Sequence, residues 1–507
     1  VKEPISEINK ESFWELIHET KNACGQNGVL ENMREVNWNN VKREAPKWFR
    51  DAKFGLFFHW GPYSVPAYQN EWYSRNMYCK GLEQNQYHEK TYGSLHDFGY
   101  KDFYDMLKGE KFDPDQWASL VKRSGAKYAG AVSEHADNFS MWDSAVNPIN
   151  SMNYGPHRDI VGECTEAFRK QGIRTVATFH HQWLWGWFMS TDNEADVYIP
   201  ENEKYYGPAL PLETNRYIPY RYPDEAFCKI WRDKVLEVID KYEPDEVYFD
   251  SRTCIIQEDY RYDVAEYYYN TRGIKDGIIT YKQEDYPKDI GVYDIECGRF
   301  SSPKDFPWQS DDRLEDNITW CMVQNPKYKS AERIIHQLCD IVSKNGNLLL
   351  NVGPYADGSF HPDAVRILEE IGDWLALNGE AIYETRPFKV AAEGPTTVDD
   401  ANYDVGKIQE QLDKGDAVDV HSDTLTAQDF RFTTHGDALY AIAFCWPEDG
   451  EFCIRTLRKG GALDGEIKKV TMLGNEGEIA FCRKEDGLYV KAPKKKPCDC
   501  AYVLKIK

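Results

Sequence analysis

Short apolar stretches alternate with segments of helical periodicity over most of the first 390 residues. The apolar stretches are rich in β-branched and aromatic residues, which is typical of buried strands. We expect strands at 54–59, 127–133, 174–180, 246–250, 277–281, 291–296, 318–323 and 347–352. We expect helices at 115–124, 158–171, 225–241, 259–271, 330–343 and 363–377, with Gly125, Gly172 and Gly346 as helix C-terminal caps. Strands that alternate with helices in this way predict an α/β protein with a (β/α)8 barrel.

The pattern changes after Pro387, where short stretches of alternating apolar and polar residues are separated by turns. Examples lie at 438–444, 469–473, 488–491 and 502–506, and they predict a C-terminal antiparallel β-sandwich. The first residues are polar with helical spacing at Phe13, Leu16 and Ile17. We therefore expect a helical lead-in over 1–45, a (β/α)8 barrel catalytic domain over 46–390 and a β-sandwich domain over 391–507.

The formal charge of the 507 residues is −23, and the largest basic cluster is Lys494–Lys496. This balance argues against a nucleic-acid partner. No apolar run approaches the roughly 18 residues that a membrane span needs, so we expect no membrane segment. The thirteen cysteines are scattered without a C-x-x-C pair, which favours reduced thiols and a cytoplasmic location. The chain begins at Val1, so a removed leader and a secreted or periplasmic location stay open.

Aromatic and polar side chains gather just after the first predicted strand. His59 and Trp60 end that strand, and Glu71 and Trp72 follow closely. Indole faces can cover the apolar C–H patches of a pyranose, while imidazole and carboxylate groups bind its hydroxyls. We interpret these residues as part of a sugar pocket, although a core strand followed by a polar turn is the plainer alternative.

Polar residues also end most of the other predicted strands, and these are His135, His180, His181, Asp250, Glu296 and Asn351. Active sites of (β/α)8 barrels lie at the carboxyl ends of the strands, so these side chains are expected to converge. The histidines and Asp250 would share one barrel mouth, where some hydrolases of this fold bind zinc. Because the histidines are mixed with tryptophans, we favour a sugar site and expect no metal and no other cofactor.

Asp250 and Glu296 are the candidate catalytic carboxylates. A glycosidase needs two such groups, about 5 Å apart if it retains the anomeric configuration and farther apart if it inverts it. One attacks as the ionised carboxylate, and the other donates a proton to the leaving oxygen. The alternatives are that both merely pair with Arg252, Arg299 or Arg313, or that the acid is Asp294, Glu258 or Glu284.

Several segments resemble the retaining α-L-fucosidases of glycoside hydrolase family 29, namely 48–61, 71–78, 158–163, 342–354 and 378–383. The resemblance implies a (β/α)8 barrel followed by a β-sandwich. It implies that Asp250 is the nucleophile and that the acid/base lies in the segment that holds Glu296. It also implies sugar contacts at His59, Trp60, Glu71, Trp72, His135 and Trp320.

The chain departs from the family pattern around the sugar. Ala136 replaces one imidazole, and the third strand ends in His180 and His181 instead of tyrosines. We expect His180 to return an imidazole to the pocket, while the space left by Ala136 would suit a substituent on C6 of the sugar.

These observations predict a retaining exo-glycosidase that releases terminal α-L-fucosyl residues from an oligosaccharide or glycoconjugate. The first alternative is an α-L-galactosidase that acts on a related, 6-substituted L-sugar. The second is an inactive sugar-binding barrel, against which the presence of Asp250 argues. Homo-oligomer formation, the linkage and the aglycone stay open.

Overall fold

A computed structural model describes residues 36–208, 223–283, 285–396 and 425–507 of the chain. The predicted lead-in positions Phe13, Leu16 and Ile17 lie outside these ranges. Within them, every helix is too short or too polar to span a bilayer. The twelve cysteines that the structure describes are free thiols.

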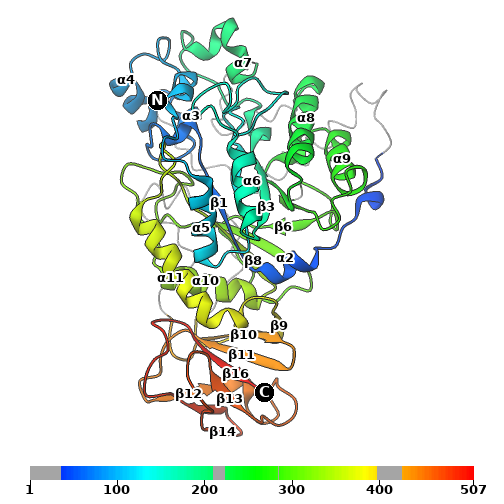
Figure 1. The fold of residues 1–507 in the computed structure, drawn as a ribbon, viewed down its shortest axis with the longest axis vertical. Coiled ribbons are helices and arrows are strands. Elements are labelled where there is room, and N and C mark those ends of the chain that lie inside the picture. Colours follow the sequence, from blue (N-terminus) through cyan, green and yellow to red (C-terminus); the bar gives the residue numbers. More distant parts are fainter. Residues whose placement is uncertain (1–35, 209–222, 284, 397–424) are drawn as a thin grey trace, which may run out of the picture.

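Eight parallel strands close into a barrel in chain order, with β8 beside β1, which confirms the predicted fold (Figure 1). The strands are β1 (Phe54–Phe58), β2 (Tyr128–Glu134), β3 (Arg174–Phe179), β4 (Glu246–Phe249), β5 (Ile278–Lys282), β6 (Val292–Asp294), β7 (Trp308–Arg313) and β8 (Gly346–Asn351). The lack of a side chain at Gly55 leaves room for the Tyr128 ring, because a Cβ at Gly55 would lie 2.5 Å from that ring. The Tyr128 hydroxyl crosses the barrel and donates to Gln309 Oε1 over 2.8 Å.

The prediction of the seventh strand at 318–323 is wrong. The seventh strand of the barrel is β7 (Trp308–Arg313), and residues 318–323 belong to the loop that follows it. The sequence of β7 is polar, yet all six of its residues are buried. Its polar side chains are bonded to partners inside or around the barrel, as Asp312 is to Lys329 and Gln337. A strand whose buried side chains are polar and hydrogen-bonded does not show the apolar pattern by which strands are recognised.

The barrel helices follow the predicted positions closely. The long ones are α5 (Pro114–Ser124), α6 (Ile160–Lys170), α8 (Glu225–Tyr242), α9 (Glu258–Glu266), α10 (Ala331–Ser343) and α11 (Pro362–Asn378), and a π-helical turn over Tyr267–Thr271 continues α9. The short ones are α2 (Lys47–Ala52), α3 (Tyr73–Asn76), α4 (Glu83–Thr91) and α7 (Glu203–Tyr206). Short 3₁₀ segments lie at Trp38–Val41, Pro62–Ser64, Tyr100–Met106, His181–Leu184, Asp196–Tyr198, Pro200–Asn202, Thr253–Ile255, Gly379–Ala381 and Arg455–Leu457.

Two of the three predicted helix caps are confirmed. Gly125 and Gly172 have φ values of 85° and 74°, which a glycine adopts without strain. Gly346 is instead the first residue of β8, and α10 ends at Ser343, with Lys344 as its C-cap and Asn345 following with a φ of 75°. Gly346 is needed for close packing, because a Cβ there would lie 2.6 Å from Ile341.

The C-terminal part is a β-sandwich, as predicted. Its strands are β9 (Arg386–Glu393), β10 (Phe430–His435), β11 (Ala438–Ala443), β12 (Glu451–Ile454), β13 (Val470–Met472), β14 (Phe481–Arg483), β15 (Leu488–Lys491) and β16 (Tyr502–Ile506). Five of them form one antiparallel sheet in the order β13-β16-β11-β10-β9, and β12-β15-β14 form the other. A separate apolar core that includes Phe432, Val490 and Leu504 lies between the sheets.

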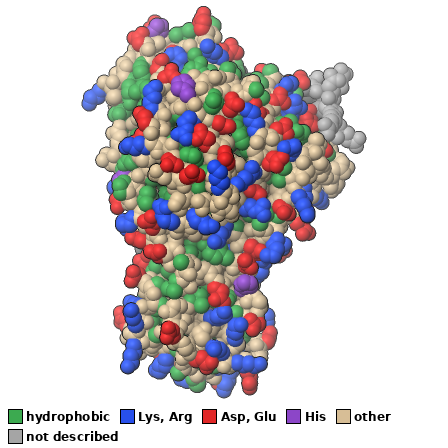
Figure 2. Space-filling view, in the orientation of Figure 1, with side chains coloured by type: hydrophobic (Ala, Val, Ile, Leu, Met, Phe, Trp, Pro, Cys, Tyr) green, Lys and Arg blue, Asp and Glu red, His purple; other side chains and the backbone are tan. Residues whose placement is uncertain are grey.

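The helices α10 and α11 lie between the barrel and the sandwich (Figure 1). Trp374 of α11 donates its indole N–H to the carbonyls of Cys500 and Ala501, both over 3.0 Å. Asp340 of α10 pairs with Arg431 of β10 and with Lys344, whose Nζ lies 2.7 Å away. Burial alone raises the pKa of Asp340, but these cations and Arg299 hold it below its ordinary value. The face in Figure 2 shows acidic and basic side chains interspersed over both parts.

Candidate active site

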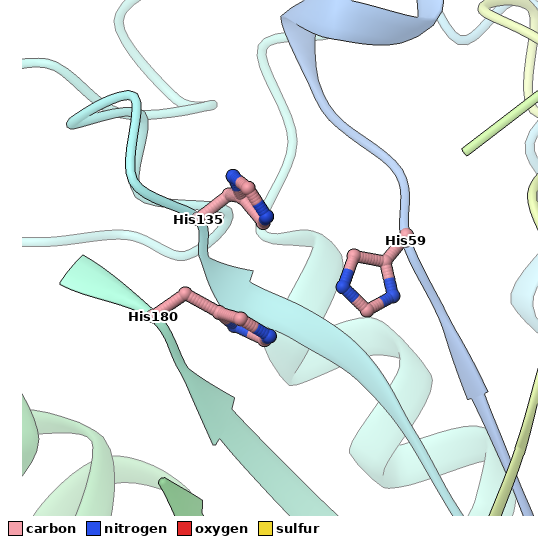
Figure 3. A group of neighbouring side chains, drawn as sticks. All are labelled: His59, His135 and His180. Carbon is pink, nitrogen blue, oxygen red and sulfur yellow. The ribbon is translucent and has the colours of Figure 1, made fainter. Parts of the chain in front are cut away.

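Three imidazoles from neighbouring strand ends meet at the barrel mouth (Figure 3). His59 follows β1, His135 follows β2 and His180 follows β3. Their ring centroids lie 5.6 Å apart for His59 and His135, 5.1 Å for His59 and His180, and 4.9 Å for His135 and His180. Each is no more than 7% exposed. The structure therefore brings His180 beside the two other predicted histidines.

All three imidazoles are neutral at pH 7. Burial lowers the pKa of His59 to about 4, and it lowers the pKa values of His135 and His180 well below the ordinary value. Asn351, the last residue of β8, accepts at Oδ1 from the backbone N–H of His59 and lies 2.7 Å from its Nδ1. Because the same Asn351 oxygen accepts both bonds, Nδ1 of His59 carries the proton and Nε2 is left as an acceptor.

Neutral imidazoles can bind either sugar hydroxyls or a metal ion. The candidate ligand atoms of these three lie within 4.8 Å of one another. The Nδ1 atoms of His135 and His180 are buried without a hydrogen-bond partner in the described structure. A buried polar group without a partner is costly.

Indole rings border the same place. Trp320 lies against His59, with ring centroids 5.5 Å apart, and its backbone N–H donates to Glu71 Oε2 over 2.9 Å. Trp72 packs against Trp183 and Trp187, at 5.7 and 4.7 Å. These contacts bring the predicted residues Glu71, Trp72 and Trp320 to the mouth.

Trp60 lies elsewhere. It is 1% exposed, and its ring packs against Phe112 and Trp117, at 5.2 and 5.5 Å. Trp117 belongs to α5. Trp60 therefore lies between the barrel and its helices, and the structure does not bring it to the other predicted sugar contacts.

The two candidate catalytic carboxylates share one ammonium group. Lys282, the last residue of β5, places its Nζ 3.2 Å from Asp250 Oδ1 and 2.8 Å from Glu296 Oε2. It also lies 3.0 Å from Asp311 Oδ2. The other oxygen of Asp250 accepts the indole N–H of Trp183 over 2.8 Å. Asp250 and Glu296 are thus both held by Lys282.

Two carboxyl groups at the mouth have raised pKa values. Burial raises the pKa of Glu296 to about 7, although Lys282 opposes this shift. Burial also raises the pKa of Glu71 to about 6, opposed by the bond from the Trp320 backbone. A carboxyl group with a pKa near neutrality can donate a proton and later take one back. Glu296 therefore suits an acid/base role.

The rival acids are placed less well. Asp294 is 1% exposed, and burial with the neighbouring Asp311 raises its pKa well above the ordinary value. Glu258 is exposed at the start of α9 and accepts from the indole of Trp38 over 2.7 Å. Glu284 lies outside the described residues.

Comparisons with known proteins agree with this geometry. The α-L-fucosidase family profile matches residues 25–380, and the profile of the α-L-fucosidase C-terminal domain matches residues 422–507. The chain belongs to the α-L-fucosidase family. It is therefore an enzyme, a glycoside hydrolase.

The relatives match the chain over most of its length. A tissue α-L-fucosidase from Rattus norvegicus is 29% identical over 485 residues, which cover 92% of this chain and 90% of the rat protein. An α-L-fucosidase from Dictyostelium discoideum is 30% identical over 70% of this chain and 75% of its own length. The crystal structure of the Thermotoga maritima α-fucosidase in complex with a mechanism-based inhibitor superposes with a TM-score of 0.72 and 25% identity, covering 94% of this chain and 100% of that chain.

Within this family member, the sequence did not reveal Lys282 or Trp183 as parts of the site. The predicted fifth strand stopped at Tyr281, one residue before Lys282. The bond from the Trp183 indole to Asp250 joins two segments that are distant in sequence, so no local pattern predicts it. The strand-end rule, applied one residue further, would have found Lys282.

Proposed function

We propose that this family member is a retaining exo-α-L-fucosidase that removes terminal fucosyl residues from oligosaccharides or glycoconjugates through a covalent intermediate. The observation that carries the proposal is the shared contact of Asp250 and Glu296 with Lys282, beside three neutral imidazoles. Two carboxylates that both contact one nitrogen lie close together. This closeness fits the retaining arrangement, in which the two groups lie about 5 Å apart, and the resemblance to the retaining α-L-fucosidases implies the same mechanism.

In the first step, a carboxylate oxygen of Asp250 attacks the anomeric carbon while the bond from that carbon to the leaving oxygen breaks. Glu296 gives its proton to the leaving oxygen. In the second step, Glu296 removes a proton from water, and the water oxygen attacks the anomeric carbon and releases Asp250. The pKa of about 7 at Glu296 supports this assignment, because the group must be protonated first and ionised afterwards.

The imidazoles and indoles would bind the sugar. His59 Nε2 is available as an acceptor, since Nδ1 is bonded to Asn351. His135 and His180, whose rings lie 5.6 and 5.1 Å from that of His59, would bind further hydroxyls. Trp72 and Trp320 would cover apolar C–H groups, including the C6 methyl of fucose. No step of this mechanism uses a metal or another cofactor.

The surroundings of Ala136 favour fucose over a 6-substituted sugar. Ala136 is 1% exposed and belongs to the apolar core, so no water-sized space adjoins its methyl group. The imidazole absent at position 136 is matched by His180, which stacks on His135. We therefore propose that the substrates are α-L-fucosides rather than α-L-galactosides. The test is kcat/KM on the two 4-nitrophenyl glycosides, and a higher value on the galactoside would contradict this choice.

The assignment of the nucleophile is tested with Asp250→Ala. We expect turnover of 4-nitrophenyl α-L-fucoside to fall by about 10⁴-fold or more, since the covalent route is lost. Added azide should fill the vacated space and displace the nitrophenolate once, which gives the fucosyl azide of inverted configuration. Proton NMR of the product reads the configuration. A variant with activity like the wild type, or an azide product of retained configuration, would overturn the assignment.

A further inference from the structure

Lys282 contacts three carboxylates at the barrel mouth, and the mechanism above gives it no role. Its side chain is 5% exposed, and its Nζ lies within 3.2 Å of carboxylate oxygens from Asp250, Glu296 and Asp311. A buried ammonium is costly unless it is paired, and here it has three anionic partners. Its position at the end of β5 places it between the strand that precedes Asp250 and the strand that precedes Glu296.

The groups that face Lys282 come from every neighbouring element. The ring of Tyr248 on β4 and the ring of Trp320 lie 5.9 Å from its Nζ. The Tyr248 hydroxyl donates to the same Asp311 oxygen over 3.2 Å. Asp294 of β6 is buried behind Asp311. His59 and His180 lie close enough for the ammonium to disfavour their protonation.

We infer that Lys282 is a positioning residue whose charge serves Asp250 and Glu296 in turn during one catalytic cycle. The inference rests on the proposed retaining mechanism. In the free enzyme, the ammonium contacts the carboxylate of Asp250, whose oxygen attacks in the first step. When Asp250 becomes an ester, it loses its charge, and in the same step Glu296 loses its proton. The ammonium then stabilises the new carboxylate of Glu296, which must act as the base in the second step.

The remaining contacts keep the ammonium in place while its partners change. Asp311 does not react, and its bonds to Lys282 and to the Tyr248 hydroxyl persist through both steps. Burial alone lowers the pKa of Lys282, but Asp311, Glu296 and Asp250 raise it well above the ordinary value. The proton on Lys282 is therefore not lost at the pH of catalysis, so Lys282 acts as a fixed charge and not as an acid.

The test is the pH dependence of kcat/KM on 4-nitrophenyl α-L-fucoside in Lys282→Met and Lys282→Gln. An opposite charge at contact distance lowers a carboxyl pKa by about 1–3 units. Loss of the ammonium should therefore move both the acid limb and the alkaline limb upward by about one pH unit or more. At pH values below both the original and the shifted acid limb, a shift of one unit lowers kcat/KM by about tenfold. Lys282→Arg keeps the charge and should keep the limbs near their wild-type positions.

Lys329→Met is the matched control. Lys329 is equally buried at 5% exposure and also pairs with a carboxylate, since its Nζ lies 2.9 Å from Asp312. Its loss should lower the melting temperature but leave both pH limbs unmoved. Lys282→Gln serves where the methionine variant does not fold, because glutamine keeps a hydrogen-bond donor without the charge.

The outcomes separate this inference from the proposed function. If the wild-type enzyme hydrolyses the fucoside and the neutral variants keep its pH limbs, Lys282 has a structural role only and the inference is wrong. If the wild-type enzyme does not hydrolyse the fucoside, the proposed function itself has failed. Upward movement of both limbs in the neutral variants, with none in Lys329→Met, supports the inference.

Discussion

Replacing Glu296 by glutamine tests the acid/base assignment most directly. The substitution keeps the size of the side chain and its contact with Lys282 but removes the transferable proton. Burial raises the pKa of Glu296 from 4.5 to about 7. At pH 6, a pKa near 7 leaves about 90% of the molecules protonated, whereas a pKa of 4.5 would leave only about 3%. The structure thus gives about a thirtyfold larger acid population than an ordinary glutamate would have.

The size of the effect depends on the leaving group. General acid catalysis contributes about 10²–10⁴-fold when the leaving group needs a proton. We therefore expect kcat/KM of Glu296→Gln to fall by about that factor on a fucosylated disaccharide. On 2,4-dinitrophenyl α-L-fucoside, whose leaving group needs no proton, the loss in kcat/KM should be less than about tenfold. The alkaline limb near pH 7 should disappear with the disaccharide, because no titrating acid remains.

The assay compares kcat/KM of the two substrates from pH 4 to pH 9 in the wild-type and variant enzymes. Azide provides a second measurement, because it can attack the fucosyl-enzyme without a base. It should raise kcat of Glu296→Gln on the dinitrophenyl substrate and give a fucosyl azide of retained configuration. Glu258→Gln is the control, since Glu258 is exposed on α9. Equal losses on both substrates would refute the reasoning, and Asp294→Asn would then be tested as the acid.

Two further predictions follow from the described contacts. Prolonged dialysis against EDTA should leave kcat/KM unchanged, because His59, His135 and His180 are expected to bind hydroxyls; a loss that zinc restores would show a metal centre instead. Asp340→Asn should lower the free energy of unfolding at pH 7 by about 3–5 kcal/mol in urea titrations, since Lys344 and Arg431 lose their shared buried carboxylate. The pKa of Asp340 in the folded state is depressed, so the carboxylate stabilises the fold fully at pH values above its unfolded pKa of about 3.9. The difference in unfolding free energy between the wild type and Asp340→Asn should therefore narrow as the pH falls below that value. A difference that grows on acidification would contradict this.

The sequence predicts the barrel well where strands are apolar on both faces. Phe54–Phe58 and Gly346–Asn351 are fully buried; the first is a continuous apolar run, and the second has three leucines in a row between two asparagines. The same rule misplaced the seventh strand, because the apolar stretch at 318–323 looked more strand-like than Trp308–Arg313. Burial in β7 depends on hydrogen-bond partners contributed by other elements, such as Tyr128 for Gln309. No local pattern in a single sequence contains that information.

The candidate site was predictable to the extent that it follows from strand ends. His59, His135, His180, Asp250 and Glu296 were each expected near the mouth, and the structure places them there. Trp60 was grouped with them because it adjoins His59 in sequence. Successive side chains in an extended chain point to opposite sides, so His59 faces the mouth while Trp60 packs against the helix α5. Adjacency in sequence is therefore a poor guide at a strand end.

The polar seventh strand is connected to the paired carboxylates of the active site through Lys282. Asp311 on β7 binds Lys282 on β5, although β6 lies between these two strands. The strand β6 ends at Asp294, and Glu296 follows two residues later, so this contact lies at the end of β6 from which Glu296 extends. A β7 of ordinary apolar residues would leave Lys282 with only the two reacting carboxylates, whose charges change during the proposed cycle. Asp311, one of the two acidic residues that make the sequence of β7 unlike a buried strand, can thus hold the ammonium in place while the charges of Asp250 and Glu296 change.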